Sequence, residues 1–534
     1  MFIVDCTLRD GGYYNSWDFP KELINKYLQA MHAADIKIVE IGFRTLINNE
    51  FNGACLFSTD EFLNSLLIPN DVLIGVMVNA SEILRHDQIN KALNRLFPNK
   101  SSDSPVKLVR IACHVFEFEK TLPAATWLKN KGYIVGFNIM QIADRTNKEI
   151  QSLAKLANEY PIDVLYFADS MGSMTPEKTE EIILSFRKEW KGSLGIHTHD
   201  NQGLAMSNTL RAIKSGVTWI DSTLTGMGRG PGNVKTEELL IETSIMQDKT
   251  INLVPVLALI REKFKPMRDK YQWGSNPFYY LGGKYGIHPT YIQEMLSDNR
   301  YKEEDILAVI EHLKVEGGKR YNSTDLDSAR KNYTISPTGK WSPKSICRDK
   351  TILLLGTGPG VKKHRHALEL YIKKHKPLVL ALNTQCSVDP EMINLRVACH
   401  PLRLLADCDL HTQLPQPLIT PFSMLPLNVK DALKNKEILD FGLKVQSETF
   451  EFKDKYCIVP SELVIAYALA ILASGGAKSI YLAGFDGYEV DDPRNIEMNN
   501  ILENFKSASE NTQLIAVTPT RYEIMKKSIY GMLE

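Results

Sequence analysis

The sequence lacks an excess of charge of either sign, and it lacks a long apolar run. Its 63 basic residues balance its 63 acidic residues, so no net field attracts nucleic acid or an anionic membrane. The longest apolar runs, such as 463–473, are shorter than the roughly 20 residues that a membrane-spanning helix needs. We therefore expect no nucleic-acid partner and no membrane span.

Cysteine is also scarce. The eight cysteines are scattered singly, without a Cys-x-x-Cys pair, which argues against a zinc finger and against a disulfide framework. Residues 1–5 read directly as a strand and show no signal-peptide pattern. Reduced thiols and this start together predict a cytoplasmic protein.

Short β-branched runs alternate with helix-like stretches eight times before residue 230. The runs are Phe2 to Cys6, Ile36 to Ile41, Val72 to Val78, Lys107 to Ala112, Tyr133 to Asn138, Val164 to Ala168, Leu194 to His197 and Thr218 to Thr223. Eight such strands predict a closed (β/α)8 barrel, the TIM barrel, over residues 1–235. Nearly every run ends in polar residues, and barrel active sites are built at those carboxyl ends.

The chain is too long for a single hydrophobic core. Residues 236–332 have helical apolar spacing and predict a C-terminal helical extension of the barrel, and a polar linker follows at 333–349. A new strand at 351–355 then runs into a glycine-rich turn. Strand, turn and helix predict a second α/β domain of the Rossmann-like kind over 350–534.

Two histidines lie two residues apart on the seventh predicted strand, so His197 and His199 point to the same face. Asp10 follows the first strand and offers a carboxylate. Two imidazoles and one carboxylate form a chelating set that leaves positions open for substrate. We expect a divalent metal, Mn²⁺ or Mg²⁺, although histidines also accept Zn²⁺, Co²⁺ or Fe²⁺.

Arg9 precedes Asp10 directly and adds a guanidinium to the predicted metal site. An aldol or retro-aldol step passes through an enolate, whose negative oxygen needs positive charge in a dry site. A divalent ion together with Arg9 would supply that charge. The pattern therefore indicates chemistry on a 2-oxo acid and an aldehyde.

These segments, with 109–114, 168–174 and 221–233, resemble the DRE-type TIM-barrel metallolyases. The nearest branch is that of the 4-hydroxy-2-oxovalerate aldolases, over residues 1 to about 330. The resemblance implies that Asp10, His197 and His199 bind the metal and that Arg9 stabilises the enolate. It also implies that Ser170 contacts the carboxylate of the 2-oxo acid.

One position departs from the aldolase branch. The branch carries a histidine base two residues beyond the Asp-Gly pair, and Tyr13 stands there in this sequence. Where the branch has a tyrosine in its C-terminal helices, this sequence places His288. We hypothesise an exchanged pair in which His288 moves the proton. Alternatively, Tyr13 is a wall of the pocket in an enzyme that has lost aldol cleavage.

Three further residues are candidate substrate contacts because they lie at the ends of predicted barrel strands. They are Arg44, His114 and Asn138. Glu40 and Asp221 also lie at strand ends, but we interpret them as structural carboxylates. Asn233 is interpreted as a residue that fixes its loop.

The second domain opens with Gly356-Thr357-Gly358-Pro359-Gly360, a turn that can present backbone N–H groups to a phosphate. With 459–462 and 480–486 it resembles the Rossmann-like domains of the sialyltransferase type and the pterin-pyrophosphokinase-like group. The resemblance implies a nucleotide or nucleotide-sugar site at Gly356, Gly358, Gly360 and Ser461. Thr357 replaces the usual asparagine, and the last hundred residues contain no histidine base. An assembly module with a vestigial glycine loop is the alternative.

The main functional hypothesis is a metal-dependent aldolase, a carbon–carbon lyase acting on a pyruvate-type 2-oxo acid and an aldehyde. By analogy with the second domain, the product would be a sugar acid for surface glycans. A Claisen-type condensing enzyme that uses acetyl-CoA and a non-catalytic binding scaffold are the alternatives. The oligomeric state stays open, a homo-oligomer included.

Overall fold

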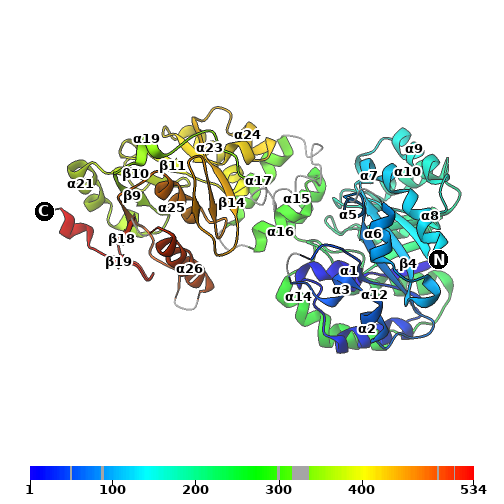
Figure 1. The fold of residues 1–534 in the computed structure, drawn as a ribbon. Helices are drawn as coiled ribbons and strands as arrows, with labels where there is room; N and C mark the ends of the chain where they lie inside the picture. The colour runs from blue at the N-terminus through cyan, green and yellow to red at the C-terminus, as the bar shows by residue number, and fades with distance from the viewer. Residues whose placement is uncertain are drawn as a thin grey trace. The chain divides into compact units, whose positions relative to one another are not determined.

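The computed structural model describes residues 1–48, 51–85, 89–297, 301–315, 336–489, 492–509 and 512–533, and they form two compact units (Figure 1). The first unit contains the described residues up to 297, and the second contains those from 301 onward. Helix α17 (Glu303–Val315) therefore belongs to the second unit, where Asp305 accepts a hydrogen bond of 2.9 Å from Nη1 of Arg403. We had expected this helix to extend the barrel.

The first unit is a closed barrel of eight parallel strands in sequence order. The strands are β1 (Phe2–Asp5), β2 (Ile38–Phe43), β3 (Leu73–Asn79), β4 (Val106–Cys113), β5 (Ile134–Ile139), β6 (Val164–Asp169), β7 (Ser193–Thr198) and β8 (Trp219–Ser222). Strand β1 pairs with both β2 and β8, which closes the sheet. The predicted barrel is confirmed, and each predicted strand lies within two residues of the observed one.

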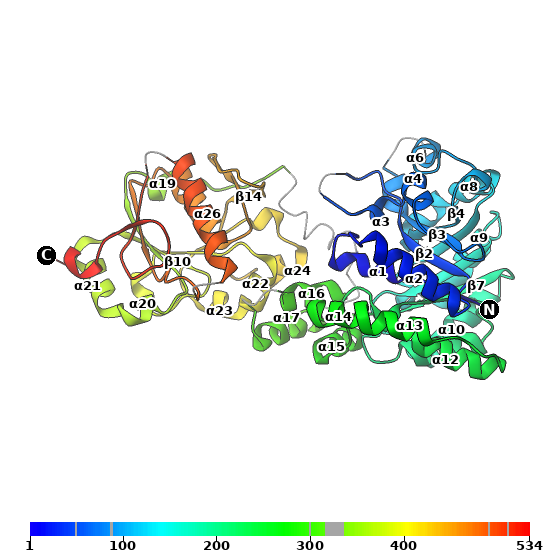
Figure 2. The ribbon, with the colours of Figure 1, turned by 90° about the horizontal axis from the view of Figure 1, so that it is seen from below.

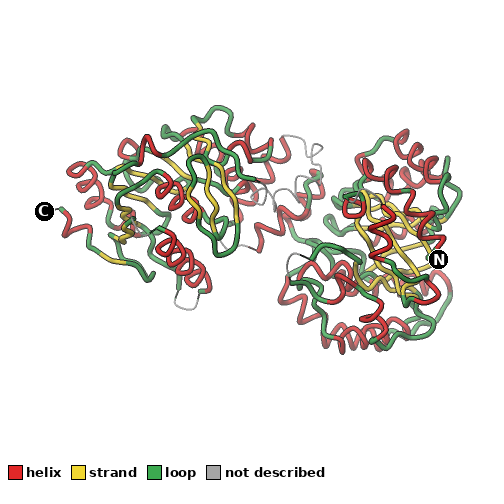
Figure 3. The backbone as a smooth tube through the Cα atoms, in the orientation of Figure 1, coloured by secondary structure: helices red, strands yellow, loops and turns green. Residues whose placement is uncertain are grey.

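Helices surround these strands (Figure 3). They are α1 (Thr7–Gly11), α2 (Lys21–Ala33), α3 (Ala54–Phe57), α4 (Asp60–Asn64), α5 (Ala80–Ile83), α6 (Ile89–Leu96), α7 (Val115–Thr121), α8 (Pro123–Asn130), α9 (Asn147–Ala157), α10 (Pro176–Arg187), α11 (Ala205–Lys214) and α12 (Thr236–Gln247). Sequence signals fix their starts: Thr146 and Glu149 form a capping box at α9, and Thr175 caps α10 ahead of Pro176.

A helical extension completes the first unit. It contains α13 (Val254–Leu259), the π-helical segment η5 (Ile260–Phe264), α14 (Lys265–Tyr271), α15 (Pro277–Tyr285) and α16 (Pro289–Ser297). Helix α13 packs against α2 (Figure 2). The extension therefore runs back along the barrel wall and brings residues near 288 towards the carboxyl ends of the strands.

The second unit contains an open sheet of eight parallel strands in the order β13-β12-β11-β10-β9-β17-β18-β19. They are β9 (Thr351–Leu355), β10 (Leu378–Leu382), β11 (Leu395–Val397), β12 (Leu418–Thr420), β13 (Ile438–Asp440), β17 (Ser479–Ala483), β18 (Gln513–Ala516) and β19 (Met525–Lys526). Chain order runs outward from β9 on one side and then on the other, as in doubly wound folds. The predicted second α/β fold is thus confirmed.

Helices cover both faces of this sheet. They are α19 (Lys344–Cys347), α20 (Gly360–Lys363), α21 (Arg365–His375), α22 (Pro401–Ala406), α23 (Cys408–Gln413), α24 (Leu427–Ala432), α25 (Val464–Ser474) and α26 (Pro493–Ala508). Leu353 and Leu355 pack towards α21, whereas Ile352 and Leu354 pack towards α25. A small sheet of β14 (Gly442–Val445), β16 (Tyr456–Val459) and β15 (Glu451–Phe452) lies beside them. None of the described helices is long and apolar enough to cross a membrane.

Helix α25 is apolar on all sides because it is buried on all sides. Replacing the fully buried Leu469 by alanine should lower the free energy of unfolding of the second unit by about 2–5 kcal/mol, through the cavity it leaves. Hydrogen exchange of the full chain should then show lost protection in β9, β10 and β17 but not in the barrel strands. The control Leu427→Ala, at a position 77% exposed, should change stability by no more than about 0.5 kcal/mol. An equal loss of hydrogen-exchange protection in both units would show that their hydrophobic cores are not independent.

Candidate active site

Three predicted metal ligands meet at the carboxyl end of the barrel. Asp10 lies on α1, directly after β1; His197 lies on β7; His199 follows the last residue of β7. All three are buried, and one donor atom from each lies within 4.8 Å of the others. The Oδ2 atom of Asp10 is 3.5 Å from Nε2 of His197. The structure therefore assembles the chelating set that the sequence predicts.

Hydrogen bonds at the Nδ1 atoms hold the two histidine rings in the orientation that the predicted metal site would require. His197 Nδ1 lies 2.9 Å from Oδ2 of Asp221, and His199 Nδ1 lies 2.9 Å from the backbone carbonyl of Asp169. A carbonyl only accepts, so Nδ1 of His199 carries the proton and Nε2 keeps its lone pair. Partners of this kind fix the tautomer and the ring angle of metal-binding histidines.

Two buried arginines tie the ligands together. Arg9 donates from Nη1 to Asp10 and from Nε to Glu40, each at 2.8 Å. Arg110 donates to both oxygens of Glu40, at 2.7 and 2.6 Å, and from Nη1 to both oxygens of Asp221 at 2.8 Å. Because Asp221 also contacts His197, the contacts close into a ring that begins and ends at Asp10. We call these six residues the charged ring.

The charged ring has an excess of negative charge. Its three carboxylates outnumber its two guanidinium groups. Burial alone raises the pKa of Asp10, but Arg9 and His197 hold that pKa well below its usual range. Burial alone lowers the pKa of His197, but Asp10 and Asp221 outweigh it and raise that pKa above its ordinary value. A divalent cation would replace the proton that these carboxylates favour on His197.

Several buried polar atoms of residues on or after the barrel strands make no hydrogen bond. They are Nη2 of Arg9, Oδ1 of Asn138 and Oδ1 of Asn233. The Arg9 Nη2 atom forms a long ion pair with Oδ2 of Asp221, at 4.0 Å. Asn233 also donates from Nδ2 to Asp10. Orphaned donors and acceptors beside three ligands fit a metal with an oxygen-rich substrate, because each isolated buried polar group is otherwise costly.

His288 lies within electrostatic reach of the site. It is buried, and burial, followed by the charges of Arg229, His199 and His114, holds its pKa well below the ordinary value. Its Nδ1 accepts the backbone N–H of Thr290 at 3.3 Å. The neutral ring therefore carries its proton on Nε2, where it can be donated.

Tyr13 is 38% exposed, and the Arg229 guanidinium lies 4.9 Å above its ring. Arg229 is thus a common neighbour of Tyr13 and His288. The exchanged-pair hypothesis stays a prediction.

The other predicted substrate residues differ in their positions. Asn138 is buried on β5, and Ser170, directly after β6, accepts the backbone N–H of Gln141 at 3.1 Å. His114 is the N-cap residue of α7. These three lie on or directly after the neighbouring strands β4, β5 and β6 at the barrel mouth, where substrate contact stays a prediction.

Arg44 does not join them. Its guanidinium donates to the backbone carbonyls of Ser58 (3.1 Å) and Leu96 (2.8 Å) and to the carboxylate of Asp60. All of these partners belong to the surrounding loops and helices. The structure therefore gives Arg44 a structural role, because its nitrogens are already engaged there.

Sequence reasoning assigned no chemical role to Arg110, although it now connects Glu40 with Asp221. The sequence separations are 70 and 111 residues, so no local pattern indicates the pairs. Asn233 was expected to fix its loop, and its hydrogen bond to Asp10 shows that it also positions a predicted ligand. A charged residue at mid-strand, as Arg110 is on β4, was the available signal.

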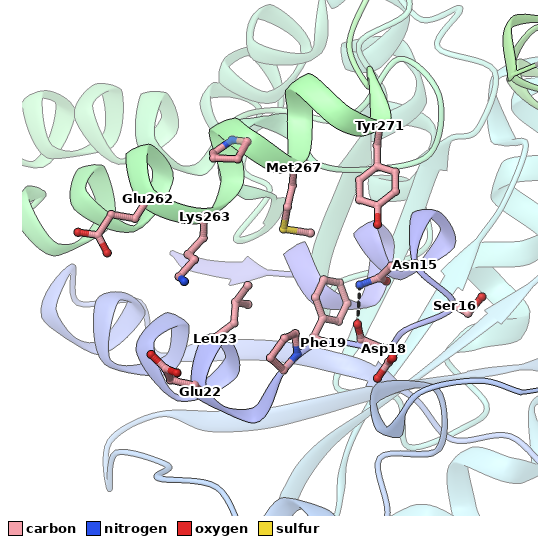
Figure 4. A pocket seen from close by; sticks show the side chains of 12 residues that line it. Asn15, Ser16, Asp18, Phe19, Glu22, Leu23, Glu262, Lys263, Met267 and Tyr271 are labelled. Carbon is pink, nitrogen blue, oxygen red and sulfur yellow. Dashed lines mark hydrogen bonds between the residues drawn. The ribbon is translucent and has the colours of Figure 1, made fainter. Parts of the chain in front are cut away.

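A cavity of about 690 Å³ lies apart from the charged ring. It opens between the segment from Asn15 to Leu23 and the segment from Glu262 to Tyr271 (Figure 4). Tyr271 on its wall also stacks on Tyr14, with ring centres 5.6 Å apart. The lining includes none of the three predicted ligands Asp10, His197 and His199, so we assign the chemistry to the charged ring and not to this cavity.

In the second unit, the glycine loop already holds an anion from its own chain. The backbone N–H of Gly360 donates to Oδ2 of Asp486 at 3.0 Å, and that of Gly358 donates to the carbonyl of Gly484 at 3.0 Å. A Cβ added at Gly358 would lie 2.3 Å from Asp486 Oδ2. The glycines thus allow the Asp486 carboxylate to approach where we had expected a phosphate.

Ser461 does not reach this loop by a hydrogen bond between described residues. Its hydroxyl accepts the backbone N–H of Leu463 at 3.4 Å, at the turn after β16. The predicted grouping of Ser461 with the glycines stays a prediction.

Known proteins match the barrel. The HMGL-like family profile matches residues 70–257. A 4-hydroxy-2-oxovalerate aldolase from Carboxydothermus hydrogenoformans is 28% identical over 325 residues, which cover 59% of this chain and 93% of the relative. One from Pelotomaculum thermopropionicum is 30% identical over 243 residues, which cover 45% of this chain and 68% of the relative. The chain belongs to the HMGL-like family.

A solved structure supports the same assignment for this HMGL-like chain. The N-terminal domain of a "putative aldolase" from Bacteroides vulgatus is 31% identical and superposes with a TM-score of 0.51. The match covers 56% of this chain and 98% of that domain. The part shared with that domain is therefore similar in length to the barrel unit.

The raised pKa of His197 gives a pH dependence for metal binding. Below that pKa the ring carries a second proton, which a metal must displace, so Mn²⁺ affinity should fall as the pH drops, starting above pH 6.5. Asp221→Asn removes a carboxylate that favours the protonated imidazole of His197, so the fall in Mn²⁺ affinity should move to lower pH. Affinity at pH 8 should also drop by about 10–100-fold.

Calorimetric titration of Mn²⁺ at several pH values measures both effects. Asp18→Asn, a substitution of an exposed carboxylate in the loop after α1, is the matched control and should leave the pH profile unchanged. A pH profile shared by the native protein and Asp221→Asn would show that Asp221 does not set the His197 proton affinity.

Proposed function

We propose that the barrel unit is a divalent-metal-dependent aldolase that joins or splits a pyruvate-type 2-oxo acid and an aldehyde. The chain is a carbon–carbon lyase of the HMGL-like family. The observation that carries the proposal is the buried Nη2 of Arg9, which makes no hydrogen bond beside Asp10, His197 and His199. Such a donor fits a site for developing negative charge.

Asp10, His197 and His199 would hold the metal, for which we propose Mg²⁺ or Mn²⁺ because the set mixes oxygen and nitrogen donors. When bound, the ion would supply a Lewis acid that polarises the oxygens of the 2-oxo acid. Arg9 holds a fixed guanidinium beside this position, because Asp10 and Glu40 orient it. Its charge is persistent, since the neighbouring carboxylates Asp10 and Glu40 outweigh burial and raise its pKa further above the ordinary value.

His288 is the proposed proton donor. Its ring is neutral, and Nε2 carries the proton. In the direction of carbon–carbon bond formation, the aldehyde oxygen gains negative charge and needs a proton. His288 would donate a hydrogen bond from Nε2–H to that oxygen as its charge develops, while Arg9 opposes the charge on the 2-oxo acid. The buried setting keeps bulk water from competing.

The second unit supports finer proposals by analogy only. We propose a sugar aldehyde and a sugar-acid product for surface glycans, made in the cytoplasm.

A nucleotide or nucleotide sugar is the proposed ligand of the second unit. Its phosphate could use the loop from Gly356 to Gly360 only after displacing the Asp486 carboxylate. Asp486→Asn should therefore strengthen binding of a nucleoside diphosphate in calorimetry, because it removes the competing negative charge.

Deuterium exchange of the methyl protons of pyruvate tests the enolate step directly. Native protein with Mn²⁺ should exchange these protons, and Asp10→Asn should abolish the metal-dependent rate. Arg9→Lys should slow exchange by about 10²–10³-fold. A lysine ammonium lacks the planar fork that lets Arg9 bond to Asp10 and Glu40 while its Nη2 group stays available. Nuclear magnetic resonance follows the loss of the methyl signal.

Asp18→Asn serves again as the control and should exchange at the native rate. Release of coenzyme A from acetyl-CoA, without pyruvate exchange, would instead indicate a Claisen-type enzyme. No metal-dependent exchange with any 2-oxo acid would favour a binding scaffold.

His288→Asn separates proton transfer from enolate formation. It should lower aldol turnover by about 10²–10⁴-fold, because the positioned proton donor is lost, while methyl exchange and Mn²⁺ binding persist. Pyruvate release from 4-hydroxy-2-oxo acids measures turnover. Tyr13→Phe tests the exchanged pair, since a catalytic hydroxyl at Tyr13 would make this variant slow as well. Full aldol turnover by His288→Asn would exclude His288 as the donor.

A further inference from the structure

A buried arginine in the second unit lacks a carboxylate partner. Arg396 lies in the middle of β11 and is 0% exposed. It donates from Nε to the Gln416 side chain at 2.8 Å and from Nη1 to the carbonyls of Asn383 (3.3 Å) and Gln385 (2.8 Å). Its Nη2 is buried without a hydrogen bond. All of its partners among the described residues are neutral, and an unpaired buried charge is costly.

Two more basic side chains lie in the same place. His411 on α23 is 0% exposed, and both of its ring nitrogens are buried without a hydrogen bond. Lys436 is 9% exposed and donates to the backbone carbonyl of Leu414. Leu414 lies two residues before Gln416, the partner of Arg396. The connection between α23 and β12 therefore gathers Arg396, His411 and Lys436.

Strand register explains why these side chains share one face of the sheet. Arg396 is the partner of Leu418, and Leu418 is the partner of Ile438. Gln416 and Lys436 lie two residues before these last two, so they point to the same face. Helix α23 covers this face, since its Cys408 packs in one cluster with Leu418 and Ile438. Figure 1 labels α23 beside β11 in this unit.

The electrostatics of this cluster are opposite to those of the barrel site. Burial, followed by the charges of Arg396 and Lys436, lowers the pKa of His411 to about 3. Burial lowers the pKa of Arg396 to about 10 and also lowers that of Lys436. By contrast, the equally buried Arg110 has a raised pKa, because Asp221 and Glu40 outweigh burial. Among the described residues, the carboxylate of Glu437 raises the pKa of Lys436, but burial and the charge of Arg396 outweigh it, so the positive charge of the cluster is not balanced.

We propose that Arg396, His411 and Lys436 form a binding site for a small oxyanion of the phosphate or sulfate class. The Nη2 group of Arg396 and one nitrogen of His411 would donate to its oxygens, and Lys436 would add charge. The site lies at β11 and at the starts of β12 and β13, whereas the glycine loop follows the carboxyl end of β9. It requires neither the proposed aldolase chemistry nor the proposed nucleotide site.

Binding would supply the missing counter-charge and stabilise the second unit. A ligand that binds only the folded state stabilises that state in proportion to the logarithm of its concentration, once above Kd. Stability of the second unit should therefore respond to inorganic phosphate. Hydrogen exchange reports this locally, because protection should rise in β11, β12 and β13.

The test uses the full chain in a chloride buffer without phosphate or sulfate. Inorganic phosphate, sulfate and acetate are titrated separately at constant ionic strength, and melting and hydrogen exchange are followed. We expect phosphate and sulfate to raise the melting temperature and to slow exchange in β11–β13 at least threefold. A response to acetate alone would overturn the tetrahedral assignment.

Variants locate the response. Arg396→Met should abolish it, and so should His411→Leu, which keeps the helix apolar and serves if the first variant does not fold. Lys434→Gln removes an exposed lysine two residues before Lys436 and should keep the full response. An undiminished phosphate response in both Arg396→Met and His411→Leu would overturn the site. Stabilisation no greater than that by chloride would do the same.

Discussion

The barrel depends on one buried carboxylate, that of Asp221. Its two oxygens accept Arg110 from the opposite wall of the barrel, and one of them also contacts Nδ1 of His197. The same group thus balances a fully buried guanidinium and orients a predicted metal ligand. A neutral residue here would leave Arg110 short of a partner and His197 without a fixed tautomer. Stability and chemistry are coupled because they use the same oxygen atoms.

Glu40 provides a second coupling between the stability of the barrel and its chemistry. It receives Arg110 on both oxygens and Arg9 on one. The guanidinium of Arg9, which we expect to face the substrate, is therefore held by a carboxylate that Arg110 fixes in place, and Arg110 itself joins strands β2, β4 and β8. Moving Arg9 would require breaking two charge-assisted bonds in a dry interior, which is unfavourable. Arg9 is therefore preorganised, and little reorganisation is needed when charge develops beside it.

The sequence predicted what local patterns determine and missed what long-range packing determines. All eight barrel strands could be predicted, because each is an apolar β-branched run with polar residues at its end. The strands β11, β12 and β13 were not predicted, because three residues are too short to show a period. Spacing and resemblance predicted Asp10, His197 and His199 as a ligand set, and the fold brings these three side chains together. The role of Arg110 was not, because its partners are chosen by the closure of the barrel.

Two fully buried arginines, Arg110 and Arg396, show why residue type alone could not indicate function. Both lie at mid-strand of a parallel sheet, and both are 0% exposed. Arg110 has carboxylates on two sides, so its charge is satisfied within the chain and it positions other groups. Arg396 has carbonyl and amide oxygens instead, and these accept hydrogen bonds without balancing its charge. The same reasoning applies to the glycine loop, where Asp486 supplies internally the anion that the pattern would otherwise invite. Whether a buried polar motif binds a ligand thus depends on whether the chain already provides the opposite charge, and only the fold reveals that.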